Sequence, residues 1–135
     1  MWFLAAAGPA GALLAGCTVP VRSLRVPGGA EARVPLDAFP ELARPGGVVR
    51  VVTPEHRGVY VRAETDGTFA AVSAVCTHQG CIVDPTPEGF RCPCHGSTFG
   101  LDGRRTGGPA RRELARFVAE RQGGDVVLRL SQESR

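Results

Sequence analysis

An all-β fold is the class that this sequence predicts, and two observations support that prediction. Gly and Pro are abundant, at 18 and 11 residues of 135, whereas strong helix formers are sparse. The apolar residues fall in short runs such as Val48 to Val52 and Val126 to Leu130, which is typical of strands separated by turns. The length fits one domain and leaves no room for a second, catalytic one.

Three strands are expected in the middle of the chain. They cover Val48 to Thr53, Val59 to Ala63 and Thr68 to Val75, and the residues that separate them include Pro54, Gly58 and Gly67. They lead directly into a cysteine-rich region.

A hairpin is expected near the C-terminus. Leu114 to Glu120 would pair with Asp125 to Leu130 across Gln122-Gly123-Gly124, a sequence that favours a tight turn. A helical turn over Ala110 to Ala119 is the alternative, because it would place Leu114, Phe117 and Val118 on one side.

Residues 1–16 are interpreted as a signal peptide or membrane anchor. The stretch from Trp2 to Leu14 is almost entirely apolar or small, yet shorter than the roughly 20 residues of a transmembrane helix. The sequence Leu14-Ala15-Gly16-Cys17 resembles the lipobox of bacterial lipoproteins, which implies cleavage before Cys17 and acylation of that residue. Because no positively charged residue precedes the apolar run, an uncleaved anchor, a start site further upstream and a buried apolar N-terminus remain alternatives. Residues 17–45 are then expected to form a tether and a first strand, and residues 46–131 the folded domain.

The net charge of +3 does not indicate a nucleic-acid-binding protein. The chain contains no lysine, and its arginines are spread from Arg22 to Arg135 instead of forming a basic stripe. A solvated, arginine-rich surface explains this charge.

Two short segments contain four of the five cysteines. They read CTHQGC at residues 76–81 and CPCHGS at residues 92–97, and both are expected on loops. Each offers one Cys and one His at short spacing, so two facing loops could present two thiolates and two imidazoles to one inorganic centre. This is the donor set of a Rieske centre, in which two His replace two Cys on one iron of a [2Fe-2S] cluster.

These paired motifs resemble those of the Rieske iron-sulfur proteins, in the branch found in cytochrome bc and b6f complexes and in small subunits of some molybdenum oxidases. The resemblance covers about Val48 to Leu130 and implies an antiparallel β-sandwich with a cluster-binding subdomain of two loops. It implies one [2Fe-2S] cluster, a disulfide, and specific ligands. The inner-iron ligands would be Cys76 and Cys92, the outer-iron ligands His78 and His95, and the disulfide Cys81 with Cys94.

Further residues are expected around the cluster. Ser97 is positioned to donate a hydrogen bond toward the cluster, which would stabilise the charge of its reduced state. High-potential members of the family have a tyrosine where this chain has Phe99, so a lower reduction potential is expected. The sequence Gly107-Gly108-Pro109-Ala110 resembles the family's proline loop, which implies that Gly108 and Pro109 shield the cluster from water. A simple Gly-Pro turn is the alternative.

Other metal or cofactor readings fit less well. The order of Cys and His is not a usual zinc-finger spacing, although a zinc site remains an alternative. Covalent haem attachment requires Cys-x-x-Cys-His, and residues 92–95 are one residue short. An oxygenase iron would need two more histidines, yet only His56 is left, and it is expected on the surface.

The expected function is one-electron transfer by an exported, membrane-anchored protein on the periplasmic side or the outer face of the cytoplasmic membrane. It would act as a carrier or small redox subunit for a partner such as a cytochrome or a membrane oxidoreductase. The alternative is the Rieske subunit of a quinol-oxidising bc-type complex, with quinol as a further partner. Gln79 argues against that alternative, because quinol-docking members of the family usually have leucine there.

Four arginines, Arg104, Arg105, Arg111 and Arg112, bracket the proline loop. If the family fold holds, they lie toward the cluster end of the domain. Two hypotheses remain open for them, namely steering of an acidic partner and simple solvation of the surface.

Overall fold

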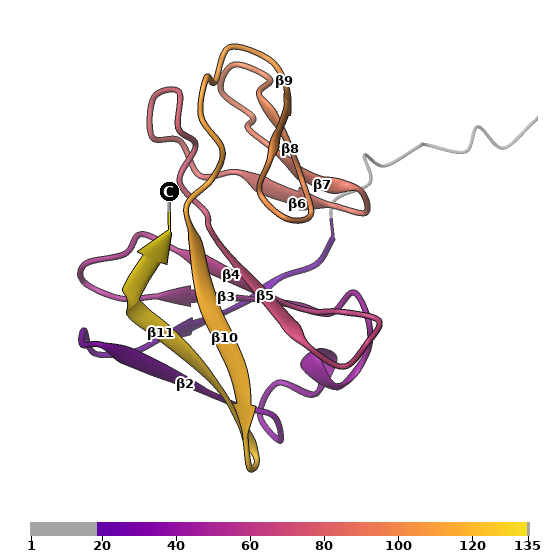
Figure 1. Ribbon diagram of the computed structural model, residues 1–135, viewed down its shortest axis with the longest axis vertical. Coiled ribbons are helices and arrows are strands. Elements are labelled where there is room, and N and C mark those ends of the chain that lie inside the picture. The colour runs from indigo at the N-terminus through magenta and orange to yellow at the C-terminus, as the bar shows by residue number, and fades with distance from the viewer. Residues whose placement is uncertain (1–18, 135) are drawn as a thin grey trace, which may run out of the picture.

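Valine-rich strands build the larger of two sheets in the computed structural model, which describes residues 19–134 (Figure 1). The strands, in their order across this sheet, are β1 (Arg22–Arg25), β3 (Val48–Val52), β4 (Val59–Ala63), β5 (Phe69–Ser73), β10 (Arg116–Gln122), β11 (Asp125–Ser134) and β2 (Glu31–Pro35). Neighbours are antiparallel except β1 and β3, which pair in parallel. The three expected middle strands are therefore confirmed within one or two residues.

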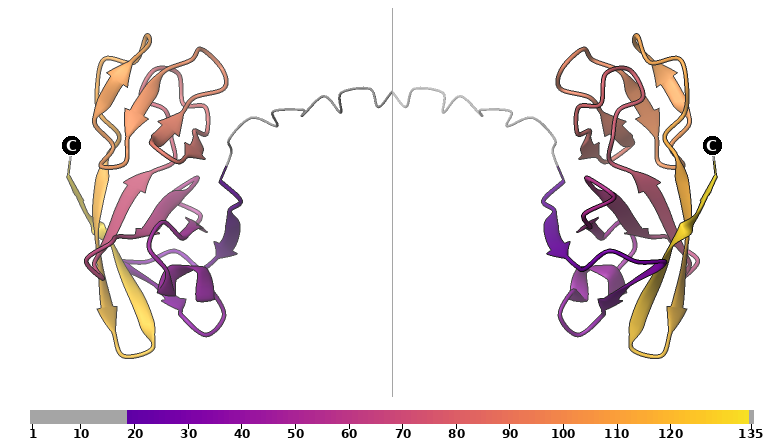
Figure 2. Two further views of the ribbon diagram at one scale, coloured as in Figure 1. Left: turned by 90° about the vertical axis from the view of Figure 1, so that its right-hand side faces the viewer. Right: turned by 90° about the vertical axis from the view of Figure 1, so that its left-hand side faces the viewer.

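The core of the larger sheet consists of small, branched side chains. Val49 and Val51 of β3 and Val59 and Val61 of β4 are completely buried, because residues two apart on a strand face the same side. Figure 2 shows β10 and β11 on one side of this core and β1 on the opposite side. The sheet thus folds over its own apolar face, and the predicted all-β sandwich is confirmed.

The C-terminal hairpin is also confirmed, and the helical alternative is wrong. Its turn is Gly123-Gly124, where Gly123 has a φ of +60° that favours glycine. Along β10, Phe117 is buried, Val118 is 39% exposed and Ala119 is buried. This alternation is the period of a strand, whereas a helix would have brought Phe117 and Val118 to the same side.

Two strands lie in residues 17–45, where a tether and a first strand were expected. Besides β1 and β2, this segment contains a short 3₁₀ helix, η1 (Pro40–Ala43). Strand β2 pairs with β11 over five residues, with Val34 opposite Val126. The expected signal or anchor segment and Cys17 lie outside the described residues. Within residues 19–134, no helix has the length and apolarity needed to cross a membrane.

A smaller sheet is inserted between β5 and β10 and lies at one end of the molecule (Figure 1). Its antiparallel strands are β6 (Asp84–Thr86), β7 (Gly89–Arg91), β8 (Thr98–Gly100) and β9 (Arg105–Gly107), in that order. Each strand has 3 residues. The two motif segments precede β6 and β8, so they project from this end.

Tyr60 connects the two sheets. It lies on β4, and its hydroxyl donates to the carbonyl of Val83, at 2.7 Å. Its ring stacks on Phe90 of β7, with centroids 5.4 Å apart. Burial raises the pKa of Tyr60, opposed by the nearby Arg50 and reinforced by Asp84, so the phenol stays protonated and available as a donor.

Candidate metal centre

The first motif segment, residues 76–81, closes into a tight loop through its own backbone. The N–H of Cys76 donates to the carbonyl of Cys81 at 2.7 Å, and the N–H of Gly80 donates to the carbonyl of Cys76 at 2.9 Å. Gly80 has a φ of +77°, a left-handed conformation that residues with a Cβ rarely adopt. The glycine between His78 and Cys81 is therefore required by the turn.

The second motif segment, residues 92–97, repeats this backbone pattern. The N–H of Cys92 donates to the carbonyl of Ser97 at 2.8 Å, and the N–H of Gly96 donates to the carbonyl of Cys92 at 3.0 Å. Gly96 has a φ of +78°, nearly that of the glycine in the first loop. Both loops thus begin with a cysteine held in the same backbone arrangement.

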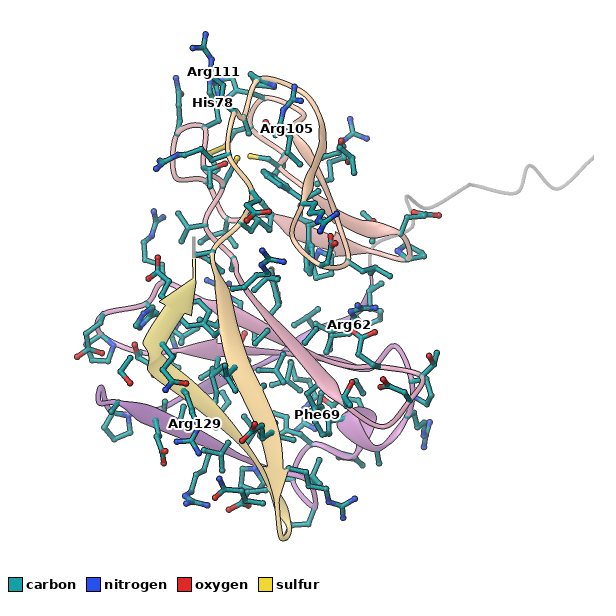
Figure 3. All side chains as sticks on the ribbon, viewed as in Figure 1. Arg62, Phe69, His78, Arg105, Arg111 and Arg129 are labelled. Atoms are coloured by element: carbon teal, nitrogen blue, oxygen red, sulfur yellow. A yellow bond between two sulfur atoms is a disulfide. The ribbon has the colours of Figure 1, made fainter. Side chains whose placement is uncertain are left out.

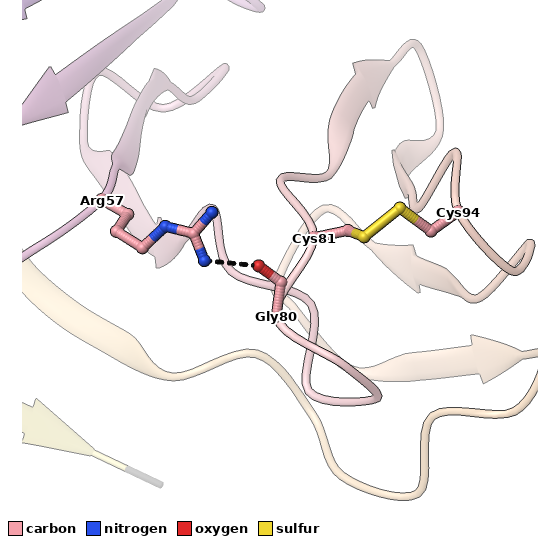
Figure 4. Close-up of a disulfide and its surroundings, with 4 residues drawn as sticks. All are labelled: Arg57, Gly80, Cys81 and Cys94. Atoms are coloured by element: carbon pink, nitrogen blue, oxygen red, sulfur yellow. Dashed lines mark hydrogen bonds between the residues drawn. A yellow bond between two sulfur atoms is a disulfide. The ribbon is translucent and has the colours of Figure 1, made fainter.

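A disulfide between Cys81 and Cys94 joins the two loops, as expected (Figure 4). Their Cα atoms are 6.5 Å apart and 13 residues apart in sequence. The sulfur of Cys92 lies within 4.8 Å of both disulfide sulfurs. From the larger sheet's side, Arg57 donates to the carbonyl of Gly80 at 2.7 Å and supports the first loop (Figure 4).

The two remaining cysteines of the motifs are free and buried side by side. Cys76 is 2% exposed and Cys92 is 1% exposed. Burial raises the pKa of the Cys76 thiol, and the neighbouring Cys92 raises it further. The backbone N–H of His78 and the hydroxyl of Ser97 oppose this rise by hydrogen bonding to the Cys76 sulfur. Two thiolates so close in an apolar site would need a cation to compensate their charge.

The two histidines of the motifs lie against one another at the same end of the molecule. Their ring centroids are 4.8 Å apart and the rings are nearly perpendicular, at 88°. His95 is exposed, whereas His78 is partly buried. The Nδ1 atom of His78 is buried and has no hydrogen-bond partner among the described residues. Leaving a ring nitrogen so buried costs about 1 to 3 kcal/mol, and a metal ion would remove this cost.

The expected proline loop packs directly on the second motif loop. The N–H of Ala110 donates to the hydroxyl of Ser97 at 3.0 Å, and Ser97 is fully buried. Gly108 has a φ of +82°, and a Cβ there would lie 2.5 Å from the Cα of Ser97. This contact explains the glycine before Pro109. Pro109 in turn lines a shallow hollow together with His78.

The four arginines near the proline loop have different surroundings. Arg104 pairs with Asp102 on the surface at 3.4 Å. Arg105 donates to two carbonyls of the proline loop, those of Gly108 and Ala110. Arg111 and Arg112 line the hollow beside His78, and neither guanidinium has a carboxylate partner within residues 19–134. Figure 3 shows His78, Arg105 and Arg111 at the same end of the molecule.

The remaining predictions for single residues have mixed outcomes. His56 lies in a loop but is only partly exposed, so the expectation of an exposed surface residue is met only in part. Its ring packs edge-on against Phe117, with centroids 5.4 Å apart, and its Nδ1 lies 3.3 Å from the hydroxyl of Thr53.

Two further residues lie at or near the motif loops. Gln79 is exposed, whereas Phe99 is 2% exposed and lies opposite Phe90 in the smaller sheet. The supporting roles of Arg57, Tyr60 and Arg105 were not predicted, because no local pattern shows what a long side chain will reach.

The paired loops correspond to a known domain. The family profile described as the Rieske [2Fe-2S] domain matches residues 33–118, which is more than half of the chain. The chain belongs to the Rieske iron-sulfur family. A Rieske domain holds a [2Fe-2S] cluster, and two buried free thiols with an unpartnered imidazole nitrogen form a donor set that fits this cofactor.

Relatives of this Rieske protein include subunits of cytochrome b6-f complexes. It is 44% identical over 73 residues to the chloroplastic cytochrome b6-f complex iron-sulfur subunit 1 of Nicotiana tabacum, which is 51% of this chain and 32% of the relative. It is 36% identical over 67 residues to the corresponding subunit of Chlorobaculum tepidum, covering 48% of this chain and 37% of the relative. The chain therefore spans about a third of the length of these relatives.

Solved structures agree with this assignment. The plasma membrane Rieske protein PetC3 from Synechocystis PCC 6803 has a TM-score of 0.59 and 30% identity, with 73% of this Rieske protein and 98% of that chain covered. A structure of the complex of reduced oxygenase and oxidized ferredoxin in carbazole 1,9a-dioxygenase has a TM-score of 0.61 at 21% identity, covering 78% of this chain and 97% of that one. The second similarity supports the fold alone.

Proposed function

We propose that this protein transfers single electrons through a [2Fe-2S] cluster held by the sulfurs of Cys76 and Cys92 and the imidazoles of His78 and His95. The observation that supports this ligand set most directly is the buried Nδ1 of His78, which has no partner among the described residues. It lies beside a second imidazole at the end where the two free thiols are also found. A bound cluster of this kind supplies a one-electron redox couple.

The protein's own residues would adjust that couple. The N–H of His78 and the hydroxyl of Ser97 lower the pKa of the Cys76 thiol, so they would stabilise added negative charge there. Ala110, packed on Ser97 and fully buried, would help to keep water from the sulfurs. The exposed ring of His95 leaves one edge of the site open to a redox partner.

Replacing each histidine by alanine tests the ligand set. We expect His78→Ala and His95→Ala to abolish the visible spectrum and to lower iron and acid-labile sulfide in the matured protein. His56→Ala is the matched control, because that ring packs on Phe117 and should leave the spectrum unchanged. Wild-type protein without acid-labile sulfide, or a His78→Ala variant with an unaltered spectrum, would contradict the proposal.

A carrier or small redox subunit is the role that we favour. The side chain of Gln79 is exposed at the first loop, where a polar amide would oppose docking into an apolar quinone pocket. The second candidate, a subunit of a quinol-oxidising complex, is supported by the names of the cytochrome b6-f relatives. Adding a quinol analogue separates the two: a shift of the cluster spectrum indicates the complex subunit, and fast exchange with a cytochrome without such a shift indicates the carrier.

The redox partner is proposed to be a protein, such as a cytochrome or a membrane oxidoreductase, with an acidic patch at its docking site. Arg111 and Arg112 are exposed beside His78 and have no ion-pair partner in residues 19–134, so they would attract such a patch. We expect electron transfer to an acidic cytochrome to slow with increasing salt, and the double variant Arg111→Gln and Arg112→Gln to lose most of that dependence. Arg104→Gln, already paired with Asp102, is the control. If the rate of electron transfer by the wild type does not depend on ionic strength, an acidic partner is rejected.

Phe99 is proposed to keep the reduction potential below that of high-potential Rieske proteins. It is buried among the residues that include Cys76 and Cys92, so a hydroxyl added to its ring would lie inside the site. We expect Phe99→Tyr to raise the potential, because a hydrogen bond to a cluster ligand favours the reduced state. A redox titration in which Phe99→Tyr has the same or a lower potential would contradict this expectation.

The protein is proposed to be exported and anchored to a membrane through Cys17, on the periplasmic side or the outer face of the cytoplasmic membrane. The disulfide between Cys81 and Cys94 supports an oxidising compartment. The similar PetC3 is described as a plasma membrane protein. Metabolic labelling with a radioactive fatty acid tests the anchor: label in the wild type and none in Cys17→Ser would support it, and an unlabelled wild type would reject it.

A further inference from the structure

Arg105 makes two hydrogen bonds to a loop that contains no other charged side chain. It lies on β9, and its Nη2 donates to the carbonyl of Gly108 at 2.8 Å. Its Nε donates to the carbonyl of Ala110. The guanidinium therefore binds the carbonyls on both sides of Pro109. A planar fork with several donors can do this, whereas the single ammonium of a lysine has no such geometry.

The contacts continue from the proline loop into the candidate metal centre. The N–H of Ala110 donates to the Oγ of Ser97 at 3.0 Å. A serine hydroxyl has one hydrogen, and with Ala110 bound to its oxygen, that hydrogen is free to point at another acceptor. Ser97 is buried beside the free thiols of Cys76 and Cys92, so the acceptors within the candidate metal centre are sulfurs. One continuous path thus leads from Arg105 through Ala110 and Ser97 to the candidate metal centre.

The residues along this path are closely packed. Ser97 is fully buried, and Gly108 approaches its backbone so closely that a Cβ would lie 2.5 Å from the Ser97 Cα. A shift of the proline loop would therefore change the distance and direction of the hydrogen bond that Ala110 donates. Since hydrogen bonds weaken steeply with poor alignment, Ser97 would lose its fixed orientation.

We propose that Arg105 is a positioning residue, which holds the proline loop so that the Ser97 hydroxyl keeps its orientation toward the sulfurs of the candidate metal centre. This inference depends on the proposed function, because the effect is on a bound cluster. It removes Arg105 from the set of arginines available for docking, since both of its bonds are made to the protein's own backbone. Arg104 offers a matched comparison, because it is the adjacent arginine and its partner is a surface carboxylate.

A double-mutant cycle on the complete, cluster-containing protein tests this role. We expect Arg105→Lys, which keeps the charge, to lower the equilibrium constant for reduction of the cluster by up to about tenfold, the scale of one ordinary hydrogen bond. Ser97→Ala should also lower the equilibrium constant for reduction. In the Ser97→Ala background, Arg105→Lys should have almost no further effect, because the hydroxyl it positions is gone. Arg104→Lys should change nothing.

Several results would overturn the proposal. A shift of equal size in both backgrounds would mean that Arg105 acts by another route. An effect of Arg105→Gln without any effect of Arg105→Lys would mean that only its charge matters. Should Arg105→Lys fail to retain the cluster, Arg105→Gln, which keeps one donor group, would be carried through the same cycle. A wild type without a cluster would instead reject the proposed function, so the two failures remain distinguishable.

Discussion

The two sheets of this protein are stabilised in different ways. In the larger sheet, strands of up to 10 residues surround a core of completely buried valines and leucines. In the smaller sheet every strand has 3 residues, and its loops are held by a disulfide, by glycines with positive φ and by single long side chains. Apolar burial dominates in the first region, whereas in the second a separate apolar cluster around Val83, Phe90 and Phe99 is supplemented by these specific links.

This difference indicates that the two regions should respond differently to substitution. Loss of apolar contacts in the core of the larger sheet should weaken the whole domain, because every strand of that sheet packs on this core. Loss of the disulfide or of one side-chain hydrogen bond at the cluster end should lower the stability of that region alone, since few other contacts replace it. Thermal unfolding recorded by two probes separates these cases: far-UV dichroism follows the strands, and the visible dichroism of the cluster follows the smaller region.

The largest effect is expected from Leu128→Ala in the larger sheet. Leu128 is completely buried on β11, and its truncation should cost about 2 to 5 kcal/mol of unfolding free energy. Both probes should report the same lower melting temperature, because the common core is weakened. The reduction potential below the transition should equal that of the wild type. If the visible midpoint stayed at its wild-type temperature while the far-UV midpoint fell, the stability of the smaller region would not depend on the core of the larger sheet.

A smaller and more local effect is expected from removing the disulfide with Cys81→Ser and Cys94→Ser together. A crosslink closing a loop of this length is worth about 3 kcal/mol when its effect is purely on the unfolded chain. Here we expect the visible signal to be lost at a clearly lower temperature than the far-UV signal, because the two motif loops can separate while the larger sheet stays folded. Leu128→Ala serves as the control in which the two transitions fall together. Coincident transitions in the disulfide-free protein would show that the cluster end depends on the shared core after all.

The same division explains how much of the fold could be predicted from the sequence. The strands around Val49, Val61 and Leu128 were found because each carries a run of β-branched or apolar residues that must be buried. The parallel pairing of β1 with β3 was not foreseen, because four residues such as Arg22 to Arg25 show no clear alternation. The family resemblance supplied the sandwich and the disulfide.

At the candidate metal centre, residue types were easier to predict than supporting contacts. The spacing of Cys and His identified the two loops, and the glycines within them match the left-handed turns that the loops contain. The packing of His56 was not predicted, because a local sequence between charged residues does not reveal that Phe117, 61 residues later, lies against its ring. The four arginines were grouped by sequence position, whereas their roles depend on which distant carbonyl or carboxylate each one reaches.

A still smaller effect is expected from Tyr60→Phe, which removes the hydrogen bond between the two regions. The Tyr60 hydroxyl donates to the Val83 carbonyl, and its loss should cost about 1 kcal/mol. The ring stacking on Phe90 is retained, so the visible midpoint should move down by more than the far-UV midpoint, by about 4 to 8 °C at most. Phe90→Leu, which removes the stacking but keeps the hydroxyl, is the companion variant. Equal shifts of the two midpoints would mean that Tyr60 stabilises the whole domain and not specifically the contact between the two sheets.

The smallest effect is expected from Asp66→Asn, in the turn between β4 and β5 and thus in the larger sheet. One Asp66 carboxylate oxygen accepts from both the N–H and the hydroxyl of Thr68, at 2.9 and 2.5 Å, and these bonds lower the pKa of Asp66 below its usual value. A carboxyl whose pKa is lower in the folded state stabilises the fold at pH values above its unfolded pKa of about 4, and this stabilisation is lost as the pH falls through the folded value. Asparagine keeps an acceptor oxygen but does not titrate.

The wild type should therefore lose slightly more stability than Asp66→Asn between pH 7 and pH 3, measured as the far-UV midpoint at each pH. Because this turn is fully exposed and belongs to the larger sheet, the difference should be small, and the reduction potential of the two proteins should stay equal over the same pH range. A difference in potential would mean that charge in this turn is felt at the cluster end. That result would contradict the division of the molecule into two regions that respond separately to substitution.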